Sequence, residues 1–186
     1  DYDVFGADAA LQEAVAREGA ASDAPALHEL GRLAGSPEAQ LWGDQANANP
    51  PVLHTHDRYG NRVDRVAYHP AYHELMRTAI AHGLHAAPWA APEEQPGAHV
   101  ARAAKMIVWS QVDAGHTCPI SMTYSVLPAL RHQPEVAAAW EPGILSTTYD
   151  PSFAPREQKA GLTCGMGMTE KQGGSDVRAN TTTARP

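Results

Sequence analysis

Residues 161–177 contain the groups best suited to holding a ligand. Period-two alternation puts four apolar residues on one side of residues 161–168, namely Leu162, Cys164, Met166 and Met168. Three of the four positions on the other side are glycine, which predicts a strand with one apolar face and one nearly bare face. A glycine face lets another group lie close against the backbone.

The expected strand leads into a polar turn. Thr169 and Glu170 are followed by the sequence Gly173-Gly174-Ser175-Asp176. Hydroxyl groups, backbone N–H groups and glycines with unrestricted φ angles are suited to binding an anionic or polar ligand. The alternative is a glycine-rich hairpin without a ligand, in which the Thr169 and Ser175 hydroxyls bond to the turn itself.

Composition excludes several classes of function. The 186 residues are 43% hydrophobic, enough for one compact domain, and their net charge is −7 without a basic run. Direct nucleic-acid binding by this chain is therefore disfavoured. Without a signal peptide or an apolar run of membrane-spanning length, we expect a cytoplasmic protein that makes no membrane contact. Cys118 and Cys164 form no ligand pattern and are expected to be reduced core residues.

Ten histidines raise the question of a metal centre. The two closely spaced pairs are His54 with His56 and His69 with His73. Neither pair belongs to an HExxH motif, a CxxC motif or a carboxylate set with ligand spacing, so we expect no metal. His69 is expected to begin a helix, and His82 and His85 to lie on the surface.

Helical periodicity and capping residues predict a mainly α-helical chain. In the first part of the chain we expect helices from Asp8 to Gly19, from Ser22 or Asp23 to Gly35, and from Ser36 to Asn49. A fourth helix is expected from Pro70 to a linker at residues 86–97, and a fifth over about 98–114. A sixth is expected from Thr117 or Cys118 to a kink or end near Pro128, and a short seventh around Val136–Trp140, before a turn at Pro142-Gly143. The 98–114 helix is apolar on all sides, which indicates an interior position. Next to it, Asp113 and His116 either approach a cavity or form a local cap, and the cap is favoured.

The polar sequence of residues 50–68 predicts a long connecting segment. Its expected features are a turn at Tyr59-Gly60-Asn61 and a short extended stretch at residues 62–66. Loops of this length are uncommon in compact domains unless they have a function. We therefore expect this segment to pack against a partner subunit or to guard a site.

The motif Thr169-Glu170 followed by Gly174-Ser175-Asp176 resembles the flavin-binding signature of acyl-CoA dehydrogenases. Most of that family has proline after the Thr-Glu pair, where this chain has Lys171-Gln172. The string from Gly165 to Val177 is most similar to the AidB branch, the flavoproteins of the bacterial DNA-alkylation response. Further similar segments are Asn47-Ala-Asn-Pro-Pro51, His69-Pro-Ala-Tyr-His73, Gln111-Val-Asp-Ala-Gly115 and Cys118-Pro-Ile-Ser-Met-Thr123.

This resemblance implies a domain organisation. Residues 1–160 correspond to the N-terminal helical domain of the acyl-CoA dehydrogenase fold. Residues 161–186 correspond to the first strand and turn of a middle β-domain. The chain lacks an initiator Met and ends soon after this turn, so we expect both ends to be cut and the β-domain to be incomplete.

The resemblance also implies FAD as the cofactor. Thr169 would bond to the flavin near N5 and O4, the backbone at Met166, Gly167 and Met168 would lie beside the ring, and Gly174 and Ser175 would face the diphosphate. Lys171 would either help to hold the phosphates or be a solvated loop residue. The family's base comes later in the chain, so Glu170 belongs to the turn and no residue here is assigned as catalytic.

Several functions follow from the resemblance. The first is the N-terminal portion of an FAD-containing, AidB-type protein that forms a homo-oligomer, a tetramer at full length, and protects during alkylation stress. Acyl-CoA is a further expected ligand, and DNA would bind only through regions outside this chain. The alternatives are an ordinary acyl-CoA dehydrogenase that desaturates an acyl thioester, and a non-catalytic helical oligomerisation module. In each case the chain alone should show no dehydrogenase activity and at best weak FAD binding.

Overall fold

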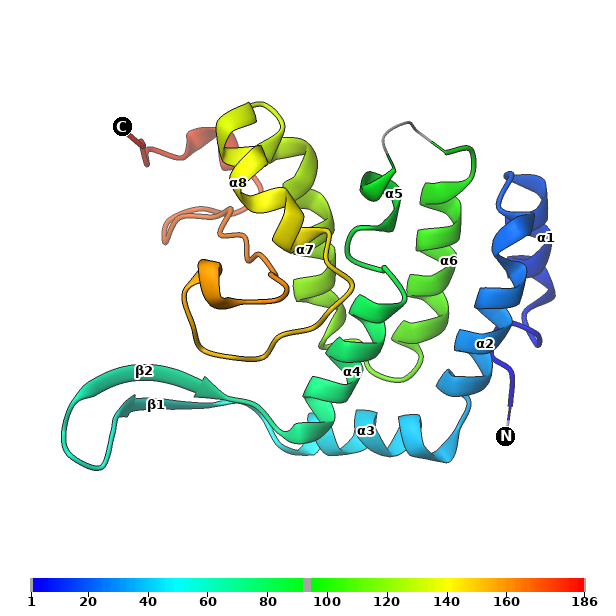
Figure 1. The fold of residues 1–186 in the computed structure, drawn as a ribbon, viewed down its shortest axis with the longest axis horizontal. Coiled ribbons are helices and arrows are strands. Elements are labelled where there is room, and N and C mark those ends of the chain that lie inside the picture. The colour runs from blue at the N-terminus through cyan, green and yellow to red at the C-terminus, as the bar shows by residue number, and fades with distance from the viewer. Residues whose placement is uncertain (1, 92–94, 186) are drawn as a thin grey trace.

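The computed structural model describes residues 2–91 and 95–185. These residues form helices and one antiparallel ribbon of two strands, and the ribbon projects from the helical body (Figure 1). The elements are α1 (Ala9–Arg17), α2 (Ala24–Ala34), α3 (Pro37–Ala48), β1 (Val52–His56), β2 (Arg62–Ala67), α4 (Pro70–Ala81), α5 (Ala87–Ala90), α6 (Ala98–Ser110), α7 (Thr117–Leu130) and α8 (Pro134–Ile144). Short 3-10 helices occupy Ala21–Asp23, Arg156–Gln158 and Val177–Ala179. The mainly α fold class is confirmed, and none of the described helices is long and apolar enough to cross a membrane.

Capping residues set the starts of three helices as predicted. The carboxylate of Asp8 accepts a hydrogen bond from the amide of Leu11 at 2.9 Å, and α1 begins beside it. Ser36 caps α3 through its hydroxyl, and His69 caps α4 through Nδ1. Proline follows both of these caps, where its missing N–H costs nothing. Asp23 precedes α2 but makes no capping hydrogen bond.

The core lies between α1, α2, α4 and α6. Trp109 on α6 is fully buried there, and its indole N–H donates to the carbonyl of Leu75 on α4 at 3.2 Å. Ala101, Ala104 and Val108 bury the same side of α6, since they recur at helical spacing. The prediction that this helix is buried all round is wrong, because Ile107 is 47% exposed.

The ribbon corrects the prediction of a polar loop at residues 50–68. Leu53 pairs with Val66 and His54 with Arg65, with an irregularity between His54 and His56. The turn at 59–61 is confirmed, with Gly60 at φ 85°, and the extended stretch at 62–66 is confirmed as β2. β1 was missed because both of its faces are exposed, so its sequence shows no alternation of buried and exposed residues.

Prolines lie inside the last turns of α7 and α8. Helix α7 contains Pro128 and ends two residues later at Leu130, in agreement with the predicted end near Pro128. The predicted turn at Pro142-Gly143 is wrong, because both residues lie inside α8. Leu127 and Ile144 beside these prolines are fully buried in one hydrophobic cluster. Burial of these side chains outweighs the single helical hydrogen bond that each proline removes.

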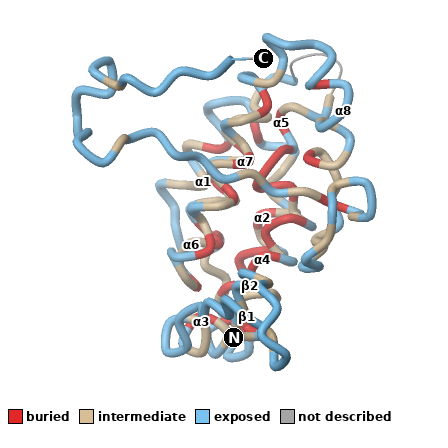
Figure 2. Tube along the Cα trace, turned by 90° about the vertical axis from the view of Figure 1, so that its left-hand side faces the viewer, coloured by how far each residue is buried: buried red, intermediate tan, exposed pale blue. Residues whose placement is uncertain are grey.

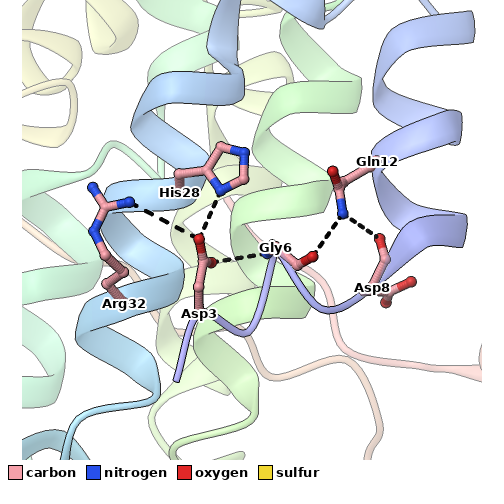
Figure 3. Close-up of polar contacts among 6 residues, drawn as sticks. All are labelled: Asp3, Gly6, Asp8, Gln12, His28 and Arg32. Carbon is pink, nitrogen blue, oxygen red and sulfur yellow. Dashed lines mark hydrogen bonds and ion pairs between the residues drawn. The ribbon is translucent and has the colours of Figure 1, made fainter. Parts of the chain in front are cut away.

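The N-terminal segment is tied to α2 through Asp3 (Figure 3). Its carboxylate accepts from the amide of Gly6 at 2.8 Å and contacts His28 Nδ1 at 2.7 Å, with Arg32 at 3.9 Å. Gly31 makes this packing possible, because a Cβ there would lie 2.3 Å from an Asp3 oxygen. Burial acts to raise the pKa of Asp3, but the hydrogen bonds from Gly6 and His28 and the electrostatic interactions with His28 and Arg32 outweigh it and lower the pKa.

We predict that Asp3→Asn lowers the free energy of unfolding at pH 7 by about 1 kcal/mol, since the hydrogen bonds from Gly6 and His28 lose their charged acceptor and the attraction of Arg32 is lost. The folded-state pKa is depressed, so the stabilisation is fully present above 3.8 and is lost as the pH falls through the folded value. Urea unfolding at a series of pH values measures the difference. Asp44→Asn on the exposed side of α3 is the control, and an equal loss there would contradict the role of Asp3.

Candidate cofactor site

Residues 161–168, the predicted strand, do not form a strand and pair with no strand in the described part of the chain. Side chains and a carbonyl of α7 and α8 hold one edge of this segment instead. Every second amide donates to this surface: Leu162 to the carbonyl of Gly143 at 2.9 Å, Cys164 to Thr123 Oγ1 at 3.0 Å and Met166 to Met122 Sδ at 3.3 Å. In a β-strand the N–H groups of every second residue point to the same edge, so this hydrogen-bonding pattern is typical of one edge of a strand.

The apolar face of this segment is only half buried. Leu162 and Cys164 pack against the cluster of Leu127 and Ile144, as predicted for a face directed at a core. Met166 is 52% and Met168 56% exposed, so the second half of the face has no cover from the described helices. Burial raises the pKa of the Cys164 thiol, whereas Cys118 is exposed, and its predicted place in the core is wrong.

The other face is closed at Gly161, where a Cβ would lie 1.9 Å from the carbonyl oxygen of Thr148, and it is open from Gly165 onwards. A Cβ placed on Gly165, Gly167 or Gly174 would meet nothing within 4 Å. The structure places the six predicted cofactor residues on one exposed stretch, which runs towards the C-terminus along the pale blue end of Figure 2: Met166, Gly167, Met168, Thr169, Gly174 and Ser175.

The polar groups of this stretch are available for a ligand. Within the described residues, the hydroxyls of Thr169 and Ser175 make no hydrogen bond, and neither do the amides of Gly167, Thr169 and Ser175. The turn-bonded hydroxyls of the alternative interpretation are therefore not found. A planar ring can lie on a bare backbone, and free N–H and O–H donors suit the oxygens of a diphosphate.

Glu170 closes the turn that presents these groups. Its carboxylate accepts hydrogen bonds from the amide of Thr181 at 2.8 Å, from the amide of Thr182 and from the side chain of Gln172. Hydrogen bonds from Thr182 and from the backbone of Thr181 lower the pKa of Glu170 to about 2. The expectation that Glu170 belongs to the turn is confirmed by these contacts.

A cavity of about 450 Å³ borders this segment at residues 163–165. Its other walls come from β2, α4 and residues 149–153. Inside it, His73 Nδ1 and the Tyr149 hydroxyl are 2.8 Å apart. Burial lowers the pKa of His73 and raises the pKa of Tyr149 to about 12, so at pH 7 the pair is uncharged. These residues are 76 positions apart, which is why sequence spacing did not reveal them.

The remaining polar candidates have structural roles. Asp113 accepts from the amide of His116 at 2.9 Å and contacts its Nδ1 at 2.9 Å, which confirms the favoured local cap. Both residues also line a cavity of about 460 Å³, so the alternative of an approach to a cavity is met as well. His85 is fully buried with Nε2 3.0 Å from the carbonyl of Ser146, so its prediction as a surface residue is wrong. No group of three potential metal ligands occurs among the described residues.

We predict that Glu170→Gln speeds amide hydrogen exchange at Thr181 and Thr182, because the acceptor that holds both amides loses its charge. The folded-state pKa near 2 lies below 4.5, so the contacts are at full strength above pH 4.5 and weaken as the pH falls towards 2. Asp176→Asn, an exposed carboxylate in the same turn, is the control. Unchanged exchange in Glu170→Gln would show that the carboxylate does not hold the turn.

Known proteins resemble this chain over nearly its whole length. The family model for the adaptive response protein AidB N-terminal domain matches residues 1–151. The chain is 46% identical to the putative acyl-CoA dehydrogenase AidB of Escherichia coli (strain K12) over 178 residues, which are 95% of this chain and 33% of that protein. It is 26% identical over 140 residues to acyl-CoA dehydrogenase family member 11 of Caenorhabditis elegans, covering 75% of this chain and 22% of that one.

Two solved structures share the fold. Bd2924 in its apo-form superposes with a TM-score of 0.82 at 26% identity, covering 96% of this chain and 35% of that one. Caenorhabditis elegans ACDH-11 in complex with C11-CoA gives a TM-score of 0.80 at 23% identity, covering 98% and 30%. The chain thus spans about a third of the length of its relatives. It belongs to the AidB family and comprises the N-terminal part of an AidB-type, acyl-CoA dehydrogenase-like protein.

Proposed function

We propose that the chain is the N-terminal part of an FAD-containing protein, in which residues 161–182 hold one side of the flavin. When bound, a flavin supplies hydride acceptance and electron transfer. The observation that carries the proposal is the exposed glycine face, with free hydroxyls on Thr169 and Ser175 at its end. These features fit a flat ring followed by a diphosphate.

Each part of the segment has a separate role in this proposal. The backbone from Met166 to Met168 lies beside the ring, where a side chain on Gly167 would take the same space. Thr169 offers its hydroxyl to the polar edge of the ring. Gly174 and Ser175 supply donors for the phosphates, and Glu170 keeps the turn closed. Lys171 is exposed in the same turn, and its charge favours an anionic ligand nearby.

In this proposal, residues 1–160 form a helical domain that supports the site, and residues 161–186 are the beginning of a β-rich domain. One structural neighbour is described with C11-CoA, and an acyl-CoA is the substrate class that we propose for the whole protein. The cavity with His73 and Tyr149 lies next to the proposed flavin segment, and its lining combines this neutral pair with the charged residues Asp64, Arg65, Asp150 and Lys159, which suits a ligand with both apolar and polar parts. A role in the alkylation response, a cytoplasmic location and self-association complete the proposal, with DNA bound only outside this chain.

Catalysis requires more than these residues. Glu170 is held by the turn, so it is not free to act as a base. The described cavity offers a neutral imidazole and a protonated phenol, and its two carboxylates are already bonded: Asp150 accepts from the amides of Ser152 and Ala160, and Asp64 is paired with Arg62. We therefore expect residues 1–186 alone to lack dehydrogenase activity.

We predict that Gly167→Leu in the full-length protein removes most of the bound FAD, since the added side chain fills the face on which the ring would lie. In residues 1–186 the same substitution should leave the thermal unfolding midpoint unchanged, because a Cβ there meets nothing within 4 Å. Flavin absorbance per polypeptide after gel filtration measures the first effect. Full flavin content in Gly167→Leu, or a full-length protein that never takes up FAD, would contradict the proposed site.

A further inference from the structure

The cavity of about 460 Å³ at Asp113 and His116 is separate from the proposed flavin site. Its walls come from the end of α3, residues 50–51, residues 68 and 72, and residues 113–119. None of residues 161–182 borders it within the described structure. A cavity of this size can hold a small organic ligand. Its ligand can therefore be inferred from its own lining, without reference to the flavin.

Asp113 gives this cavity a negative charge. Its side chain is 14% exposed, and its Oδ2 makes both contacts with His116, to the amide and to Nδ1. Burial acts to raise the pKa of Asp113, but the hydrogen bonds from the amide and the ring of His116 outweigh it and lower the pKa. The carboxylate is therefore ionised at pH 7. Because both contacts use Oδ2, Oδ1 keeps the capacity to interact with a ligand.

His116 does not neutralise this charge. Burial lowers the pKa of His116 in spite of the hydrogen bond with Asp113, so the imidazole is neutral at pH 7. Since Nδ1 contacts an ionised carboxylate, Nδ1 carries the proton and Nε2 carries a lone pair. Nε2 has no hydrogen-bond partner among the described residues. None of the described lining residues is Lys or Arg, so the cavity keeps its negative charge.

Two stacked tyrosines form the aromatic part of the lining. The rings of Tyr68 and Tyr72 lie 4.3 Å apart with an angle of 17° between their planes. Burial raises the pKa of Tyr72 well above its usual value, so its phenol is uncharged. The face of a tyrosine ring attracts a cation that lies within about 6 Å of its centroid. Three prolines of the same lining add apolar surface: Pro50, Pro51 and Pro119.

We propose that this cavity binds a small organic ammonium ion. The charge of the ion lies beside the carboxylate of Asp113, and its alkyl groups lie against the tyrosine rings and the prolines. An ionised carboxylate, uncharged aromatic rings and apolar walls together match a cation that carries alkyl groups. The site takes part in no covalent step, and it does not depend on the flavin proposal.

Other ligand classes fit this lining less well. An inorganic metal ion needs several ligands, and the described residues contain no group of three His, Cys, Asp or Glu that could supply them. An uncharged acyl chain would leave the ionised carboxylate of Asp113 buried without a partner of opposite charge, which costs free energy. A phosphate or carboxylate would be repelled. The cavity beside the glycine segment differs, because Arg65 and Lys159 line it.

Isothermal titration calorimetry of the full-length protein tests the proposal with choline and its uncharged isostere 3,3-dimethylbutan-1-ol. We expect the dissociation constant of choline to be lower by at least about tenfold. Asp113→Asn should abolish this preference, because the amide has the shape of the carboxylate without its charge. Asp44→Asn, which changes the net charge equally on the exposed side of α3, is the matched control and should keep the preference.

Tyr68 provides a second pair of variants that leaves Asp113 and His116 in place. Its side chain is 39% exposed, so it can be replaced without opening the core. Tyr68→Phe keeps the ring face and should bind choline like the wild type, whereas Tyr68→Leu should raise the dissociation constant by about fivefold. Circular dichroism checks that each variant keeps its helix content.

Three results would overturn the proposal. The first is equal affinity for choline and the uncharged isostere, which would indicate an apolar pocket. The second is the absence of choline binding at about 10 mM. The third is binding by residues 1–186 but not by the full-length protein, which would show that the rest of the polypeptide fills the cavity. Flavin absorbance per polypeptide in the same samples should be equal in Tyr68→Phe and Tyr68→Leu, so this test is independent of the flavin site.

Discussion

The hydrogen bond between the Cys164 amide and Thr123 Oγ1 determines where the candidate site lies. Thr123 is fully buried on α7, and its hydroxyl donates to the carbonyl of Pro119 at 2.7 Å while it accepts from Cys164. A buried hydroxyl with both functions satisfied fixes its neighbours, since losing one partner costs about 1–3 kcal/mol. Through this contact the helical body sets the position of the extended segment, and the open glycine face follows from it.

Residues 162–167, which this hydrogen bond helps to hold, have a buried apolar part and an open glycine part. Leu162 and Cys164 pack against the hydrophobic cluster of α7 and α8, while a Cβ added at Gly165 or Gly167 would meet nothing within 4 Å. Glu170 then folds the following turn back on itself through Thr181 and Thr182. Burial thus ends within two residues of the point where the proposed ligand-binding groups begin. A rigid support next to an exposed polar turn is the arrangement that preorganised binding requires.

Local chemistry predicted much of the fold, and long-range packing explains the rest. Caps such as Asp8 and Ser36 act on amides three residues away, so their helices could be located from the sequence. The continuation of α7 past Pro128 depends on burial of Leu127 against Ile144, a contact between segments distant in sequence. The six residues proposed to hold a cofactor belong to one sequence motif and could be proposed together from it, whereas His73 and Tyr149 meet only in three dimensions.

The amides of residues 162, 164 and 166 all donate hydrogen bonds to α7 or α8, and this regular spacing limits how another strand can pair with the segment. The amides of Thr163, Gly165 and Gly167 alternate with them and are unpaired within the described residues. A further strand can therefore pair with the free edge of this segment only in the register that places its carbonyls opposite the amides of Thr163, Gly165 and Gly167. The contacts with the helices would then set the register of the pairing before a second strand binds.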